Sequence, residues 1–181
     1  TKRMFSYFCD VYGKHIISGQ QEYCGSHSYN LDADPTLGYI VDNEAEFEYI
    51  LDKTGKMPAI RGIDFINYSS AENMWDDNAA ERAVEWTNKF GGICAISWHW
   101  SVPSEEGKTG CADRAFYVES ANPSFTTFSI SNALTEGTWE NEVLMKDIEV
   151  LASKFQLIED ADVPVMFRPL HEAEGAWFWW G

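Results

Sequence analysis

A short apolar segment that runs into polar groups decides the fold: Val163-Pro164-Val165-Met166-Phe167-Arg168-Pro169-Leu170-His171-Glu172. Its first part has the length and apolar content of a buried β-strand. Three other segments share this character, being short, apolar and closed by polar or small residues: residues 15–19, 58–65 and 93–100. The sequence therefore predicts four strands.

Helical patterns lie between these strands. A helix that begins near Thr138 is predicted by apolar residues that step by four, three, four and three, namely Leu144, Ile148, Leu151, Phe155 and Ile158. A second helix ends at Gly91-Gly92 and has an apolar stripe of Ala79, Ala83, Trp86 and Phe90, and a shorter one covers about Glu44 to Lys53. Strands that alternate with such helices predict right-handed crossovers, a parallel sheet and the α/β class.

Two architectures compete, an open doubly wound sheet and a (β/α)8 TIM barrel. Gly19-Gln20-Gln21, after the first strand, lacks the glycine fingerprint of dinucleotide-binding open sheets. Polar residues close all four strands, including Asp64, His99 and Glu172. In a barrel they would converge at the C-terminal face, where such folds keep their chemistry. We therefore predict a barrel.

A complete barrel needs about 250 residues and eight units, whereas this chain has 181 residues and four units. We expect residues 1–181 to be the N-terminal half of a single barrel domain, covering about the first four β/α units. A half-barrel exposes the edges of its outer strands, which natural parallel sheets avoid. The chain alone is therefore expected to associate with itself or to be poorly soluble.

Charge and composition restrict the partners. The net charge is -16 and the pI near 4.4, so nucleic acid and anionic membrane surfaces are excluded as expected partners. No stretch approaches the roughly 20 apolar residues that span a bilayer, and Thr1-Lys2-Arg3-Met4 is not followed by a signal-peptide core. We expect a secreted, extracellular protein whose leader has been removed.

The cysteines and histidines do not predict a metal site or a cofactor. Four cysteines without C-x-x-C spacing are too few for a disulfide scaffold. Cys94 lies in an apolar strand and is interpreted as a small buried hydrophobe, whereas Cys24 and Cys111 lie in polar loops, and we predict a disulfide between them. His171-Glu172 lacks the second histidine of the H-E-x-x-H zinc motif.

Glu172 is the candidate catalytic residue. It combines a solvent-facing carboxyl group with the neighbouring imidazole of His171 and the indoles of Trp177, Trp179 and Trp180, which suits protonation of the leaving group of a ring-shaped polyol. Surrounding Trp and Phe side chains would exclude water and keep the carboxyl group protonated. The structural alternative is a carboxylate that stabilises a helix N-terminus.

Five other residues are candidates for substrate binding. His99 and His171 suit recognition of sugar hydroxyls or orientation of a carboxylate, although single histidines at strand ends are often structural. Trp177 follows the flexible Gly175 and would offer a sugar platform. Arg168 would tether carboxylates in the barrel mouth, and Asp64 fits the same group by position. The other indoles, including Trp98 and Trp100, are interpreted as core packing.

Together these motifs resemble glycoside hydrolase family 26, chiefly endo-β-1,4-mannanases. The resemblance covers about residues 19–181, in family order, and rests on Arg168-Pro169-Leu170-His171-Glu172, the run Gly175 to Gly181, Ser97-Trp98-His99-Trp100, Gly62-Ile63-Asp64-Phe65 and Gly19-Gln20-Gln21. It implies a retaining hydrolase with two glutamates. Glu172 corresponds to the acid/base, His171 to a residue that contacts the nucleophile, and His99 and Trp177 to substrate contacts. Arg168 corresponds to a buried arginine behind the site.

The resemblance also implies that the nucleophile, after the seventh strand, is missing from this chain. Retaining hydrolysis needs two carboxyl groups about 5–5.5 Å apart, so residues 1–181 alone are expected to be inactive. The expected substrate is mannan, galactomannan or glucomannan, and carbohydrate-binding or cellulosomal modules could be appended. The alternatives are a non-catalytic carbohydrate-binding fragment, a β-1,3-1,4-glucanase and a β-1,3-xylanase.

Overall fold

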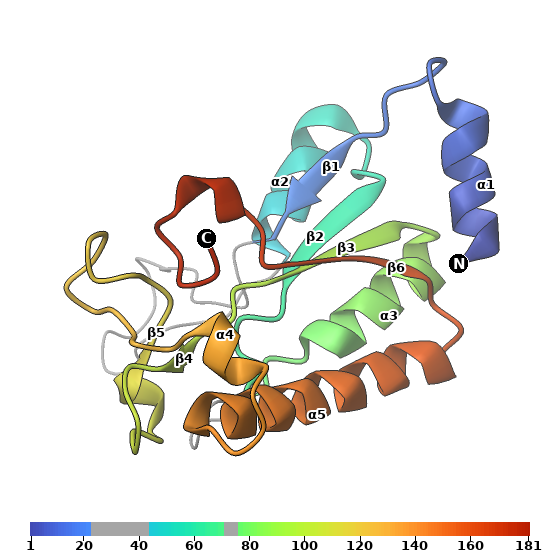
Figure 1. Cartoon of the computed structure of the whole chain (residues 1–181). Coiled ribbons are helices and arrows are strands. Elements are labelled where there is room, and N and C mark those ends of the chain that lie inside the picture. Colours follow the sequence, from blue (N-terminus) through green and yellow to red (C-terminus); the bar gives the residue numbers. More distant parts are fainter. Residues whose placement is uncertain (23–43, 71–75) are drawn as a thin grey trace, which may run out of the picture. The chain divides into compact units, whose positions relative to one another are not determined.

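The computed structural model describes residues 1–22, 44–70 and 76–181 of the chain (Figure 1). Four strands form one sheet in the order β1-β2-β3-β6, and β4 and β5 form a separate antiparallel pair. The elements along the described chain are α1 (Lys2–Val11), β1 (Gly19–Gln21), α2 (Ala45–Thr54), β2 (Ile60–Asp64), α3 (Ala79–Phe90), β3 (Ile93–Trp98), β4 (Val102–Pro103), η1 (Cys111–Asp113), β5 (Arg114–Ala115), α4 (Ile130–Ala133), α5 (Trp139–Asp160), β6 (Val165–Pro169) and η2 (Ala173–Gly175).

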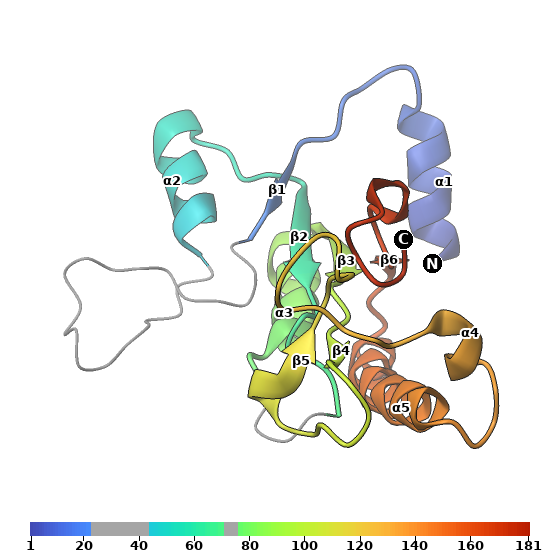
Figure 2. The same ribbon diagram turned by 60° about the vertical axis from the view of Figure 1, so that its left-hand side comes forward.

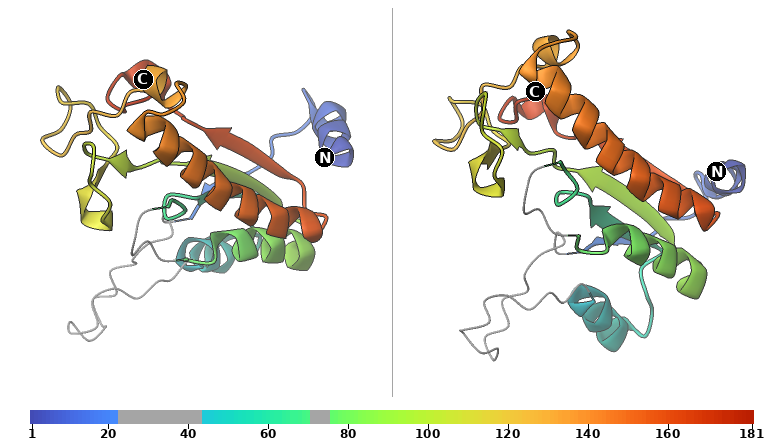
Figure 3. Two further views of the ribbon diagram at one scale, coloured as in Figure 1. Left: turned by 60° about the horizontal axis from the view of Figure 1, so that its bottom comes forward. Right: turned by 90° about the horizontal axis from the view of Figure 1, so that it is seen from below.

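The four-stranded sheet is parallel. In the β1–β2 pair, Gly19 lies opposite Ile60 and Gln21 opposite Gly62. The chain passes through α3 between β2 and β3 and through α5 between β3 and β6 (Figure 3). Parallel neighbours require such long crossovers, because a tight turn can join only antiparallel strands. The predicted α/β class is therefore confirmed.

Three predicted strands correspond to β2, β3 and β6, but the prediction for the first strand is wrong. Strand β1 begins only at Gly19, and the side chain of Ile16 is 99% exposed. The pairing with β2 explains the difference, because residues 19–21 have partners in register on β2. The predicted segment 15–19 therefore overlaps β1 only at Gly19, and the strand lies further along the chain than predicted.

The predicted helices correspond to α2, α3 and α5. Helix α3 ends as predicted, since Gly91 adopts a left-handed conformation (φ 66°) and its N–H donates to the carbonyl of Thr87. The predicted apolar stripe of α5 is wrong at one position. Ile148 is exposed and its neighbour Asp147 is fully buried, because Asp147 has buried donors as partners that periodicity cannot reveal.

Two compact units divide the described residues. Of the described residues, the first unit comprises 1–22, 44–64, 77–96 and 156–167, and the second comprises 65–70, 76, 97–155 and 168–181. The first encloses Phe47, Ile63, Ala83, Trp86, Cys94 and Ile96, and the second encloses Phe65, Trp98, Trp100, Phe128, Leu151 and Trp179. In the second unit, β4 and β5 lie side by side (Figure 2). None of the described helices combines the length and apolar character needed to cross a bilayer.

Candidate active site

The second unit contains five of the six candidate residues: His99, Arg168, His171, Glu172 and Trp177. They come from the segment after β3 and from the segment that begins in β6. Both follow the carboxyl ends of parallel strands, as the sequence predicted. The residues that follow these two strand ends thus belong to the same compact unit, as one site would require.

His99 and His171 form the centre of the site. Their Nε2 atoms are 3.0 Å apart, and their rings meet edge to face with centroids separated by 4.1 Å. His171 is buried and His99 is half-buried. One Nε2 must donate a proton and the other must accept it, so the ring that accepts is neutral. Such a pair can present a hydrogen-bonding edge of fixed orientation to a sugar hydroxyl or to a carboxylate.

An aromatic wall stands behind the histidines, and we define it as Phe116, Tyr117 and residues 177–180. Phe178 lies 5.6 Å from the His99 ring centroid and stacks on Trp180 at 4.3 Å. The indole N–H of Trp180 donates to the carbonyl oxygen of His171 at 2.9 Å. This bond fixes the backbone on which both His171 and Glu172 lie.

Glu172 begins the 3-10 turn η2 and is exposed. Its backbone is left-handed (φ 58°), as are those of Leu170 and Ala176, so three of the five described non-glycine residues with positive φ fall within seven positions. Each such residue costs on the order of 1–3 kcal/mol, and they cluster at functional sites. The exposed Glu172 therefore lies within a strained stretch of backbone.

The expectation that Trp and Phe side chains shield the carboxyl group of Glu172 from water is wrong for the part of the chain that the structure describes. The indoles do not enclose its carboxyl group, because Trp179 is buried against Trp100 and Trp180 stacks on Phe178. Packing of these rings with one another leaves the carboxyl group in contact with water. Within the described ranges Glu172 also makes no ion pair.

Trp177 is the exposed member of the aromatic wall. Its side chain is 41% exposed, whereas Trp98, Trp100 and Trp179 are 3–6% exposed, so the interpretation of those three indoles as core packing is confirmed. The indole of Trp177 folds over Gly175, where a Cβ atom would lie only 2.2 Å from the ring. A side chain at position 175 would therefore displace the indole from this place. A sugar contact of Trp177 stays a prediction.

Asp64 and Arg168 differ from the rest of the candidate set. Asp64 closes β2 and is 1% exposed, but it belongs to the first unit. Arg168 is exposed, so the expectation of a buried arginine is wrong. The reason is its position, because β6 lies at one edge of the described sheet and its last three residues are exposed. Substrate contacts of both residues stay predictions.

Sequence reasoning missed the loop that supports the wall. The N–H of Val118 donates to the carbonyl of Trp177 at 3.0 Å, and that of Trp179 donates to the carbonyl of Phe116 at 2.9 Å. Tyr117 stacks on Phe178 with centroids 5.5 Å apart. The loop has neither strand nor helix periodicity, so its only signal was the aromatic pair Phe116-Tyr117.

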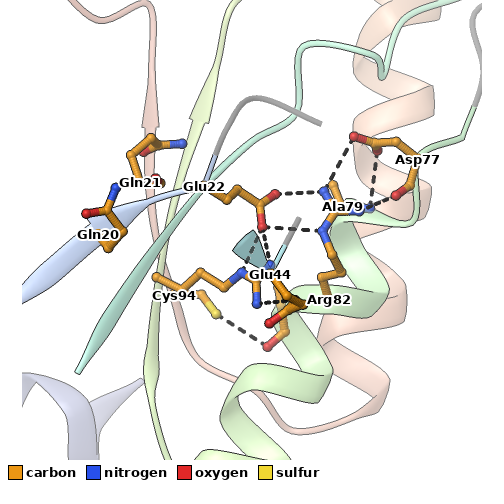
Figure 4. A network of polar contacts seen from close by, with 10 residues as sticks. Gln20, Gln21, Glu22, Glu44, Asp77, Ala79, Arg82 and Cys94 are labelled. Carbon is orange, nitrogen blue, oxygen red and sulfur yellow. Dashed lines mark hydrogen bonds and ion pairs between the residues drawn. The ribbon is translucent and has the colours of Figure 1, made fainter. Parts of the chain in front are cut away.

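The first unit contains a buried charged cluster (Figure 4). Glu22 is fully buried, and its two carboxylate oxygens bind Arg61 at 2.6 Å and Arg82 at 2.7 Å. Arg61 also pairs with Glu44 at 2.7 Å, and Arg82 pairs with Asp77. Burial alone would lower the pKa of Arg82, but hydrogen bonds and charge from Glu22 and Asp77 outweigh it and the pKa is raised.

The cysteine predictions have separate outcomes. Cys94 is fully buried, its Sγ lies 3.3 Å from the carbonyl oxygen of Ala83, and burial raises its pKa to about 11. It is therefore the buried hydrophobe that was predicted. Cys24 lies outside the described residues, so its disulfide with Cys111 stays a prediction. Across residues 1–22, 44–70 and 76–181, no group of three or more His, Cys, Asp or Glu could hold a metal ion.

Comparison with known proteins gives consistent matches over the chain. The family model described as "Glycosyl hydrolase family 26" matches residues 1–181. Mannan endo-1,4-beta-mannosidase B of Piromyces sp is 37% identical, over all of this chain and 28% of its own length. The crystal structure of a ruminal GH26 endo-beta-1,4-mannanase is 40% identical, with TM-score 0.83, over 99% of this chain and 36% of the other.

A third match is the crystal structure of Podospora anserina GH26-CBM35 beta-(1,4)-mannanase, 33% identical with TM-score 0.73, over 99% of this chain and 36% of the other. The chain thus spans about a third of the length of these proteins. The predicted (β/α)8 barrel is confirmed, and the four described strands and their crossovers form about its first four β/α units.

Proposed function

Because this chain belongs to glycosyl hydrolase family 26, we propose that the protein containing it is an endo-acting retaining glycoside hydrolase that cleaves β-1,4-mannan. The observation that carries the proposal is the exposed Glu172, held on a strained backbone one residue after the His171–His99 pair. The three proteins described above are all named as mannanases or mannosidases. Their agreement supports mannan rather than a β-glucan or β-1,3-xylan.

Glu172 acts first as general acid. A carboxylate nucleophile, which we expect on residues outside this chain, attacks the anomeric carbon and forms a glycosyl ester. The bond between the anomeric carbon and the glycosidic oxygen breaks, and Glu172 gives its proton to that oxygen. The exposure of Glu172 suits this role, since its carboxyl group must reach a large substrate and afterwards a water molecule.

Glu172 then acts as general base. Its carboxylate takes a proton from water, the hydroxyl oxygen attacks the anomeric carbon, and the ester to the nucleophile breaks. The pair of His99 and His171 orients the sugar and the nucleophile, and the indole of Trp177 stacks on a sugar face. Asp64 and Arg168 are proposed as further substrate-binding residues.

Glu172→Ala in the protein expressed from its complete reading frame tests the acid role. Mannan turnover should fall about 10²–10⁴-fold, the usual contribution of a general acid. A dinitrophenyl β-mannoside, whose leaving group needs no proton, should still release a burst of dinitrophenolate. Glu174→Ala, an exposed glutamate two residues away, is the control and should retain full turnover. Unchanged mannan turnover in Glu172→Ala would refute the role.

The substrate class, location and further modules belong to the same proposal. Mannan, galactomannan or glucomannan is too large to cross a membrane, which favours a secreted, extracellular enzyme. A carbohydrate-binding module accompanies the Podospora anserina enzyme, which favours appended modules here too. Comparing kcat/KM on glucomannan, mixed-linkage β-glucan and β-1,3-xylan tests the specificity. A higher value on either of the last two would overturn the choice of mannan.

A further inference from the structure

The carboxylate of Asp147 joins three separate segments of the second unit. It is fully buried in α5. One oxygen accepts the backbone N–H of Ser70 at 2.5 Å, and the other accepts the indole N–H of Trp100 at 2.6 Å and binds Arg114 at 2.8 Å. A buried carboxylate with three donors is held in one orientation, and it holds its donors in turn.

Trp100 leads from Asp147 to the aromatic wall. Its ring lies 4.9 Å from that of Trp179, in an edge-to-face arrangement. The indole N–H of Trp179 donates to the carbonyl oxygen of Trp100 at 2.9 Å. Trp179 is therefore fixed both by packing and by a buried hydrogen bond. Its chain neighbours Phe178 and Trp180 both lie close to the histidine pair, with ring centroids 6.0 and 6.3 Å from that of His171.

Arg114 provides a second connection. It lies in β5, and besides Asp147 it donates through Nε to the hydroxyl of Ser101 at 3.1 Å and through Nη2 to the carbonyl of Ser101. Phe116 and Val118 follow within three residues of the end of β5, and their backbones bond to Trp179 and Trp177. The guanidinium therefore anchors the start of the loop that holds Trp177.

We infer that Asp147 is a positioning residue for the aromatic wall, and above all for Trp177. This inference rests on the proposed function, because Trp177 is the platform proposed for the sugar. A purely structural ion pair would stabilise the unit without affecting sugar binding. Both connections from Asp147 reach Trp179 or Trp177. The backbone near Glu172 has two further bonds outside these connections, from the N–H of Gly175 to the carbonyl of Glu172 and from the indole of Trp180 to the carbonyl of His171.

The connections predict which kinetic constant changes. A displaced stacking platform loses binding that ground state and transition state share, so KM rises and kcat is preserved. Loss of the stacking contact corresponds to a rise of roughly two- to ten-fold in KM. A merely destabilised protein gives the opposite result, since a smaller folded fraction lowers the apparent kcat and leaves KM unchanged.

The test is Asp147→Asn in the protein expressed from its complete reading frame. The amide keeps the shape of the carboxylate but lacks the negative charge that pairs with Arg114. Glu140→Gln is the matched control, because Glu140 is a buried carboxylate of the same helix whose partner, Asn132 at 2.8 Å, lies in α4. We measure kcat and KM on mannohexaose, and binding of mannohexaose by tryptophan fluorescence in a Glu172→Gln background.

Asp147→Asn should raise KM and the dissociation constant of mannohexaose by about two- to ten-fold, and Glu140→Gln should change neither. An unchanged KM in folded Asp147→Asn would overturn the inference. Should that variant not fold, Ser101→Ala removes one hydrogen bond from Arg114, and an unchanged KM there would overturn it instead. If the unmodified protein does not cleave mannohexaose, the proposed function fails. That outcome differs from an unchanged KM in Asp147→Asn or Ser101→Ala, which would overturn only the inference about Asp147.

Discussion

Among the described residues, each compact unit encloses a fully buried carboxylate that binds arginine, Glu22 in the first and Asp147 in the second, and their surroundings differ. In the first unit, Glu22 uses both oxygens on Arg61 and Arg82. In the second, Asp147 binds Arg114 together with an indole and a backbone N–H. The partners of Glu22 end in other ion pairs, with Glu44 and Asp77, whereas those of Asp147 continue to the aromatic wall. The same group can thus serve stability alone or stability and substrate placement.

Glu22→Gln should have the largest effect. It leaves two buried guanidinium groups with less compensating charge, and breaking such a buried pair costs about 3–5 kcal/mol. Urea denaturation monitored by circular dichroism should show a loss of unfolding free energy of this size. The folded fraction should bind mannohexaose with unchanged affinity. A weaker affinity for mannohexaose in Glu22→Gln would show that Glu22, like Asp147, affects substrate binding.

The distinction itself could not be predicted from the sequence. Short apolar strands, helix stripes and a glycine stop gave the α/β class, and polar residues at strand ends gave His99, His171 and Glu172. Periodicity favoured Ile148 over Asp147 for the buried face of α5, because a buried charge depends on partners distant in sequence. The left-handed backbone of Glu172 depends equally on packing around it. Local patterns predict elements, and buried polar networks require coordinates.

Thr138→Ala should have a smaller effect, confined to stability. The hydroxyl of Thr138 accepts the N–H of Asn141 at 3.1 Å at the start of α5, and loss of such a cap costs about 1 kcal/mol. The urea midpoint should fall and KM should stay unchanged. Thr135→Ala, an exposed hydroxyl bound to the carbonyl of Ser131, is the control. A rise in KM would show that any destabilisation of this unit mimics loss of Asp147.

Gly175→Ala should affect KM without affecting stability by more than a few tenths of a kcal/mol. The added Cβ would lie 2.2 Å from the Trp177 ring, so the exposed indole must move. Losing its stacking on the sugar should raise KM roughly two- to ten-fold. Gly110→Ala is the control, because its Cβ would meet Asp113 only at an ordinary 3.6 Å. An unchanged KM would remove Trp177 from the proposed site.

Ionisation of the Cys94 thiol should have the smallest effect on stability, and none at neutral pH. Burial raises its pKa from 9.0 to about 11, so the folded state holds the thiol proton more tightly than the unfolded chain. The contribution to stability is complete below pH 9 and is lost as the pH rises through about 11.

Other groups titrate in the same range, so the measurement is a difference. The unfolding free energy of the unmodified protein minus that of Cys94→Ala should be constant up to about pH 8 and should fall by about 1 kcal/mol by pH 10. Cys9→Ala, at an exposed thiol, should show no such trend. If the difference in unfolding free energy for Cys94→Ala did not change with pH, water would have to reach the thiol. The interior of the first unit would then be hydrated, whereas the buried ion pairs of Glu22 require an interior from which water is excluded.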